Sequence, residues 1–354
     1  MGRCGVHNAT GCGAGFQDLE CYMVLNNTFQ KSALAALSCT VGALCILENA
    51  VVLCIIISSL RLRGRPSYLF LGSVALADFL ASIIFTYSFV DFHVFKGTSS
   101  RGLFLWKLGG VIACFTASLG SLLLTAFDRY ICIHRPSVYK AIVTRKRALV
   151  SLAGTWVITL VIAYLPWMGW DCCQRNAFCS ELFPLIDNRY LTCWLCIVLV
   201  LLIAIIYSYS HILWKAHKHV CHMEQWRQQA AQAHGQPNMR MDILLAKTLA
   251  LLLSVILLCW SPVLLLMMYS LLHNLTGDIK RAFAFCCNLC LLNCMVNPLV
   301  YALRSRDMRL RLKKGLIWFG GLLRLPGQSQ EAGCGQLNSA RNIVSEEALD
   351  DTDS

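Results

Sequence analysis

The residues with the most evident chemistry in this chain are polar side chains that interrupt long apolar segments. At the usual helical rise of about 1.5 Å per residue, Asp78 lies about 17 Å along one such segment, near the midplane if that segment crosses a membrane. An ionisable group at that depth is costly and usually functional. Comparable depths in other segments are occupied by Asn49, Ser118, Asn293 and Asn297. These residues predict one buried network around a cation or a water cluster; the alternative is a single hydrogen bond between helices.

Stripes of side chains lead toward these polar positions. Their members recur at intervals of three and four residues, as one face of a helix does. Each stripe is aromatic or apolar toward one end and polar toward the middle, and convergent stripes of this kind predict a ligand pocket. The same pattern is also typical of an ordinary packed core. The stripes are Val111, Phe115, Ser118, Leu122, Thr125 and Arg129; Cys287, Cys290, Cys294, Asn297 and Tyr301; and Asp78, Phe85, Phe89 and Phe92.

A charged motif stands at the end of one apolar segment. Asp128–Tyr130 reads D-R-Y, and Asp242 offers an opposite charge to Arg129 from the start of another segment. We expect an ion pair between these segments. The alternative is that Arg129 only extends to the membrane surface.

Two further motifs put a proline inside an apolar segment. Cys259–Pro262 reads C-W-S-P, and Asn297–Tyr301 reads N-P-L-V-Y. Proline removes a backbone hydrogen bond and bends a helix, so Pro262 and Pro298 mark two hinge candidates.

The composition is that of a membrane protein. Of the 354 residues, 57% are hydrophobic and 14% charged, and the mean hydropathy is +0.57. Seven segments have the roughly 20 apolar residues that a membrane helix needs, and none alternates like a barrel strand. The fold class is therefore an all-α membrane protein, a seven-transmembrane-helix bundle. The net charge of +12 is not gathered into one patch interleaved with aromatics, which argues against a nucleic-acid partner. The spans are expected at 33–59, 67–90, 102–133, 148–170, 189–214, 243–272 and 279–303.

The distribution of positive charge predicts the orientation. Most of the 31 Lys and Arg residues follow the first, third, fifth and seventh spans, which places the N-terminus outside and the C-terminus in the cytoplasm. Glycosylation sequons at Asn8 and Asn26 agree with this orientation. No cleavable signal peptide is recognised, so we expect the first span to act as the insertion signal.

Four parts are expected along the chain. An extracellular segment at 1–32 precedes the seven-helix domain at 33–303. A basic amphipathic helix at 304–318 should lie on the lipids of the inner leaflet. The polar, acidic stretch at 319–354 is expected to be a disordered cytoplasmic tail.

The three motifs D-R-Y, C-W-S-P and N-P-L-V-Y, in this order on seven spans, resemble the rhodopsin-like G-protein-coupled receptors. Longer stretches are similar to cannabinoid receptors, and the similarity runs from about Ser32 to Asp307. The adjacent Cys172-Cys173 and the short loop between the fifth and sixth spans favour the type 2 branch of that family. The similar stretches are Ser88–Phe95, Phe115–Tyr130, Cys179–Ile186, Ile212–His217 and Ala282–Cys286.

The resemblance implies a plasma-membrane receptor, not an enzyme, with no cofactor and no metal site apart from a sodium-linked network. Its ligand would be a neutral lipid endocannabinoid. It would signal through inhibitory Gi/o proteins to lower adenylate cyclase activity, with arrestin and receptor kinases acting at the tail. By position, the ligand set would be Phe85, Phe89, Phe92, His93, Val111, Phe115, Phe183, Trp194, Trp260, Phe283 and Cys287. The switch set would be Asp128, Arg129, Tyr130, Asp242, Trp260, Asn297, Pro298 and Tyr301, and the sodium or water set Asn49, Asp78, Ser118, Asn293 and Asn297.

The chain departs from the family pattern at two pocket positions. Cys287 stands where the family usually has a serine, and Ile112 where the type 2 branch has a threonine. Hydrogen bonds that those hydroxyls give to a ligand are therefore not expected here.

The extracellular disulfide also departs from the wider class. That class bridges the outer end of the third span to the following loop, but the third span here begins without a cysteine. Cys172, Cys173 and Cys179 all lie within the loop, and spacing alone does not choose between the first two. The family pattern implies Cys172 with Cys179.

Two alternatives to this function remain. A receptor for another lipid, such as a lysophospholipid, would want several cations at the pocket mouth. A channel or transporter would need a polar pathway through the membrane, whereas these stripes turn aromatic above Asp78. Amine receptors of the wider class have an aspartate where this chain has Val111, so a cationic ligand is not expected.

Overall fold

The computed structural model describes residues 22, 25, 27–95, 100–172, 179–229, 238–304 and 308–310; within its helices, the side chains of 216, 219–250, 252 and 299–304 are not described. The chain divides into two compact units, residues 1–304 and 305–354, and the architecture below is that of the first. In the described part, seven helices are long and apolar enough to cross a membrane. The predicted fold class, a bundle of seven membrane helices, is therefore confirmed.

All but one of the membrane helices are longer than the apolar segments from which they were predicted, and the fourth is shorter. The fourth span ends at 164 rather than near 170, and the fifth span continues as one helix to 229. Two short helices that were not predicted, α2 and α5, follow the first and third spans. The elements are α1 (Thr28–Ser58), α2 (Leu60–Gly64), α3 (Pro66–His93), α4 (Arg101–His134), α5 (Pro136–Ile142), α6 (Arg145–Tyr164), α7 (Asn188–Gln229), α8 (Asn238–Leu272) and α9 (Gly277–Arg304).

Capping residues set where several helices begin. The side chains of Asn27, Ser100 and Thr144 accept hydrogen bonds from the first turns of α1, α4 and α6, which satisfies a backbone donor that has no partner within the helix. Pro66 and Pro136 begin α3 and α5, where a missing N–H costs nothing. The residues at these boundaries therefore determine where the helices begin and where the connections between them lie.

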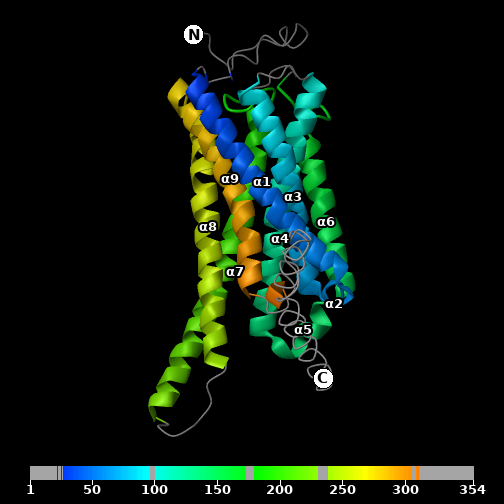
Figure 1. Cartoon of the computed structure of the whole chain (residues 1–354), viewed down its shortest axis with the longest axis vertical. Helices are drawn as coiled ribbons and strands as arrows, with labels where there is room; N and C mark the ends of the chain where they lie inside the picture. The colour runs from blue at the N-terminus through cyan, green and yellow to red at the C-terminus, as the bar shows by residue number, and fades with distance from the viewer. Residues whose placement is uncertain are drawn as a thin grey trace, which may run out of the picture. The chain divides into compact units, whose positions relative to one another are not determined.

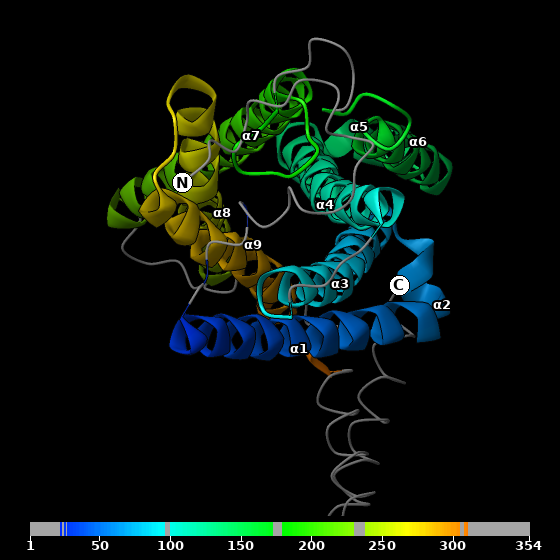
Figure 2. The same cartoon turned by 90° about the horizontal axis from the view of Figure 1, so that it is seen from above.

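The spans form a ring, as Figure 2 shows from above. Helix α1 packs on α3, α3 on α4, α4 on α7, α7 on α8 and α8 on α9, and α9 returns to α1. Helix α6 packs on α3 and α4 from outside the ring, and α7 and α8 project beyond the other spans at one end (Figure 1). Helix α4 contacts α3, α5, α6 and α7, so it is the span through which most of the bundle is connected.

The outside of the ring is apolar, as a lipid environment requires. On α6, Val150, Val157 and Ile158 are 65%, 60% and 60% exposed. The polar residues Asp78 and Asn297 are instead fully or almost fully buried. Apolar side chains outside and polar side chains inside are the reverse of the arrangement in soluble proteins, and this agrees with a multi-pass membrane protein.

Several expectations lie outside the described residues. These are the sequons at Asn8 and Asn26, the tail at 319–354, and all but 304 and 308–310 of the amphipathic segment at 304–318.

The contact between α1 and α3 depends on one glycine. A Cβ on Gly42 would collide with the Thr86 side chain, whereas a Cβ on Gly154 would meet nothing within 4 Å. We expect Gly42→Ala to lower the apparent melting temperature of the purified protein by several degrees, since overpacking typically costs about 1–3 kcal/mol. Gly154→Ala is the matched control and should leave the melting temperature equal or higher. Equal melting temperatures for the two variants would contradict the close approach.

Candidate ligand pocket and coupled polar network

Asp78 lies at the centre of a buried hydrogen-bonded cluster between three helices. Its carboxylate accepts from Ser118 Oγ of α4 at 2.6 Å and from Asn297 Nδ2 of α9 at 2.8 Å. The three residues are at most 2% exposed. Hydrogen bonds are the only compensation for burying such a group away from water, so the cluster ties α3 to α4 and α9.

The other two predicted members of the network do not contact the carboxylate directly. Asn49 donates from Nδ2 to the carbonyls of Cys45, at 2.9 Å, and Cys294, at 3.2 Å, which joins α1 to α9. Asn293 is 2% exposed. The Oδ1 atoms of Asn49, Asn293 and Asn297 are buried and accept no hydrogen bond among the described residues. Amide and carboxylate oxygens are ligands that hard cations take, so this donor set fits a small cation or waters.

Two adjoining cavities of about 150 and 80 Å³ lie within the ring, away from the D-R-Y end. They share Phe85, Val111 and Cys287, so they form one pocket with a mouth and a deep part. All eleven residues of the expected ligand set line one or both cavities. The mouth includes Phe85, Phe89, Phe92, His93, Val111, Phe183, Phe283 and Cys287, and the deep part adds Phe115, Trp194 and Trp260.

Aromatic rings form a continuous path down this pocket. Phe89 stacks on Phe85 with centroids 4.7 Å apart, and Phe85 meets Phe115 edge to face at 5.9 Å. Phe115 in turn meets Trp260 edge to face at 5.8 Å. Trp260 stands two residues before Pro262, which lies inside α8. A ligand that displaces these rings would therefore push directly on the part of α8 that contains Pro262, a hinge candidate.

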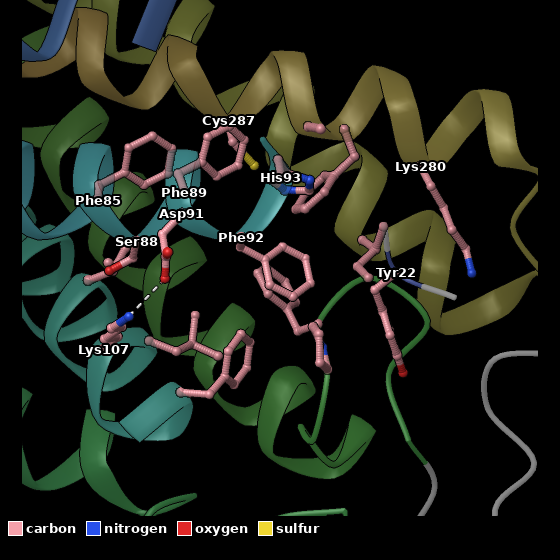
Figure 3. A pocket seen from close by; sticks show the side chains of 18 of the residues that line it. Tyr22, Phe85, Ser88, Phe89, Asp91, Phe92, His93, Lys107, Lys280 and Cys287 are labelled. Atoms are coloured by element: carbon pink, nitrogen blue, oxygen red, sulfur yellow. Dashed lines mark hydrogen bonds and ion pairs between the residues drawn. The ribbon is translucent and has the colours of Figure 1, made fainter. Parts of the chain in front are cut away.

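The charged side chains at the mouth pair with one another. Lys107 Nζ lies 3.0 Å from Asp91 Oδ2, and Lys280 Nζ lies 3.5 Å from Glu181 Oε2. Figure 3 shows the first pair with its dashed contact, and Lys280 beside Tyr22 on the other side of the mouth. The sequence reasoning missed Glu181 and Tyr22 as lining residues, because folding of the loop and of the segment before α1 brings them to the pocket. Asp91, which lies on α3 beside the expected Phe92, was also missed.

The loop between α6 and α7 covers this mouth. A disulfide joins Cys172 to Cys179, as the family pattern implied, with Cα atoms 5.2 Å apart. The backbone of the loop is fixed further by Cys172 N–H donating to the carbonyl of Leu185 at 3.0 Å. These links hold Phe183 against Phe283, edge to face, with centroids 5.5 Å apart.

Asp128 at the opposite end of α4 has partners from two further elements. It pairs with Arg129 at 2.6 Å, and accepts from Ser67 Oγ at 3.0 Å and Tyr139 Oη at 2.7 Å. Arg129 also donates to Ser67 Oγ. Burial, together with the neighbouring Asp128 carboxylate, raises the pKa of Tyr139, which keeps its phenol protonated as a donor. Ser67 and Tyr139 were missed by sequence reasoning, since no spacing rule connects them to D-R-Y.

The remaining switch residues are placed only in part. Asp242 lies within α8 and Tyr301 within α9, but neither side chain is described, so the expected pairing of Arg129 with Asp242 remains a prediction. Pro298 lies inside α9, as the motif indicated. The Tyr130 ring stacks on His134, with centroids 4.2 Å apart.

Comparison with known proteins agrees with this architecture. The family described as 7 transmembrane receptor (rhodopsin family) matches residues 48–301. Cannabinoid receptor 2 of Homo sapiens is 52% identical over 304 residues, covering 86% of this chain and 83% of the relative. Cannabinoid receptor 2 of Mus musculus is 51% identical, with 93% of each chain covered. Cannabinoid receptor 1 of Taricha granulosa is 49% identical, with 84% of this chain and 65% of the relative covered.

Seven membrane helices, six in a ring and α6 packed outside it, with a pocket toward one end and a hydrogen-bonded arginine at the other, define a seven-transmembrane receptor. The chain belongs to the rhodopsin family of these receptors and, within it, to the cannabinoid receptors. It is thus a G-protein-coupled receptor of the membrane and not an enzyme.

Substitution of Ser67 tests whether the contacts at the D-R-Y end hold the resting state, because the Ser67 hydroxyl contacts both members of the Asp128–Arg129 pair. We expect Ser67→Ala to raise ligand-free G-protein activation several-fold, since hydrogen bonds to charged groups contribute about 1.5–3 kcal/mol. The measurement is basal GTPγS loading at matched surface expression. Ser58→Ala is the control, because Ser58 is exposed and bonds only to the carbonyl of Ile55 in its own helix. Basal loading at or below that of the parent would contradict this role for Ser67.

Proposed function

We propose that the chain is a plasma-membrane receptor for neutral lipid endocannabinoids that signals through inhibitory Gi/o proteins and lowers adenylate cyclase activity. The observation that carries the proposal is the charge balance of the pocket. Each lysine that lines it stands beside a carboxylate, Lys107 with Asp91 and Lys280 with Glu181. The rest of the lining is mainly aromatic and aliphatic.

Magnitudes favour a long neutral ligand in such a pocket. Placing an unpaired charge among these side chains would cost several kcal/mol. Each buried CH₂ of an acyl chain gains about 0.8 kcal/mol, so a chain of many methylenes supplies the affinity without ionic contacts. Val111 lines both cavities where an amine receptor has an aspartate, and the two carboxylates of the lining, Asp91 and Glu181, are already paired with lysines. The similarity to cannabinoid receptors 1 and 2 supports the same ligand class.

The remaining parts of the proposal concern placement and partners. The concentration of Lys and Arg after alternate spans supports an extracellular N-terminus and a cytoplasmic C-terminus. The four parts, at 1–32, 33–303, 304–318 and 319–354, follow from that orientation, with glycans at Asn8 and Asn26. Arrestin and receptor kinases would act at the acidic, Ser- and Thr-containing tail. The oxygens around Asp78 would hold sodium or water.

A direct experiment tests the ligand and the G protein together. Membranes that contain the receptor are mixed with purified Gi or Gs, and GTPγS loading is measured with a neutral endocannabinoid or a lysophospholipid. The proposal predicts that the neutral lipid stimulates loading of Gi and that the lysophospholipid does not. Stimulation by the lysophospholipid alone would show that the chain is a receptor for that other lipid. Loading of Gs alone would refute the proposed coupling to Gi.

Val111 tests the charge argument inside the pocket. We expect Val111→Asp to weaken binding of a neutral endocannabinoid by more than about 100-fold, because a desolvated carboxylate would lie against the acyl chain. Asn has nearly the same shape as Asp without its charge, so the Val111→Asn variant should bind the neutral endocannabinoid more tightly than Val111→Asp does. The measurement is radioligand binding at matched surface expression. If Val111→Asp bound the neutral endocannabinoid as tightly as the parent does, Val111 would not line the ligand site and the proposed pocket would be wrong.

A further inference from the structure

A cluster of histidine and aromatic rings joins α4 to α7 close to the D-R-Y motif. His134 is the last residue of α4, and its ring centroid lies 4.8 Å from that of His211 on α7. Tyr130 contacts both rings, with centroids 4.2 Å from His134 and 5.5 Å from His211. Neither histidine has a part in the proposed function, so their proximity requires its own explanation.

The hydrogen bond that His134 makes fixes its tautomer. His134 Nδ1 lies 3.1 Å from the backbone carbonyl of Tyr130, and a carbonyl only accepts, so Nδ1 carries the proton and donates. The lone pair is therefore on Nε2. That nitrogen is buried and has no hydrogen-bond partner among the described residues. A backbone carbonyl on one ring nitrogen and a free lone pair on the other is the arrangement of a metal-ligating histidine.

His211 presents a second nitrogen in the same condition. Its Nδ1 is buried and also has no hydrogen-bond partner within the described part of the chain. Two bonds of about 2.0–2.1 Å from one zinc-type ion allow two imidazole nitrogens to lie up to about 4 Å apart. The ring centroids of His134 and His211 are 4.8 Å apart, so the two rings are close enough to share one ion. Both residues are partly exposed at this end of the bundle.

We propose that His134 and His211 form a binding site for one divalent transition-metal ion of the zinc class, with water completing its coordination. Imidazole suits Zn²⁺, Cu²⁺ and Ni²⁺ alike. An ion at this site would fasten α4 to α7 one turn from Arg129. In the proposed orientation the site faces the cytoplasm, but the binding argument does not depend on the ligand or the G protein.

One nearby cation opposes the ion. Lys215 follows His211 by one turn of α7, and its Nζ donates to the carbonyl of Ile133 at 3.0 Å, beside His134. Its charge repels a dication, so binding should be tighter when this ammonium is removed. This gives a variant that is expected to change affinity in the opposite direction from loss of a ligand.

The experiment uses Ni²⁺ as probe, because the 20 cysteines of the chain would compete for zinc. Calorimetric titration of the purified receptor with Ni²⁺ should show a site whose affinity falls by at least about tenfold in His134→Gln and in His211→Gln. Loss of a residue that only hydrogen-bonds a metal ligand already lowers metal affinity by about tenfold or more, so loss of a ligand itself should cost no less. His217→Gln, a change to an exposed histidine on the same helix, should leave the affinity unchanged. Lys215→Gln should tighten binding several-fold, and Ni²⁺ should raise the melting temperature of the parent.

Unchanged Ni²⁺ affinity in folded His134→Gln and His211→Gln would overturn the site. A loss of Ni²⁺ affinity in His217→Gln as large as in those two variants would overturn it as well. The melting temperature of each metal-free variant shows whether it folds. If the two ligand variants unfold, Lys215→Gln decides: tighter binding supports the site, and unchanged binding refutes it.

Discussion

The carboxylate of Asp78, fully buried between three membrane helices, is the constraint on which the rest of the structure depends. A group of this kind is tolerated only when its oxygens are hydrogen-bonded, and its partners Ser118 and Asn297 come from α4 and α9. The position of α3 is thereby fixed relative to the next helix, α4, and to α9, which is distant in sequence. A second link through Asn49 adds α1 to the same assembly.

The same helices carry both functional ends of the molecule. Helix α4 holds Phe115 in the deep part of the pocket, Ser118 on the carboxylate and Arg129 at the far end, all within one rigid element. A displacement of Phe115 toward Trp260 therefore acts on a helix whose other contacts include the Asp78 cluster and the Asp128–Arg129 pair. We infer that coupling between ligand and G protein follows from this shared helix and from the prolines inside α8 and α9, which mark hinge candidates.

Sequence alone could predict what lies within helices, because helical spacing determines which side chains share a face. The stripes containing Val111 and Cys287 do line one pocket. Contacts created by loops could not be predicted, since spacing says nothing about where a loop returns: Glu181 beside Lys280 is one case. Comparable depth also did not imply contact, because Asn49 bonds to backbone carbonyls rather than to Asp78. The extension of α7 to 229 was missed because polar helix beyond the membrane has no apolar signal.

The central claim is that the Asp78 cluster couples the pocket to the D-R-Y end. The most direct measurement is agonist affinity for the parent and for Asp78→Asn in membranes, with NaCl varied against N-methyl-glucamine chloride at constant ionic strength. The sodium ion proposed for this cluster would stabilise one arrangement of α3, α4 and α9, so agonist affinity of the parent should fall as sodium rises. In Asp78→Asn this dependence should disappear. The same sodium dependence in both proteins would contradict the account.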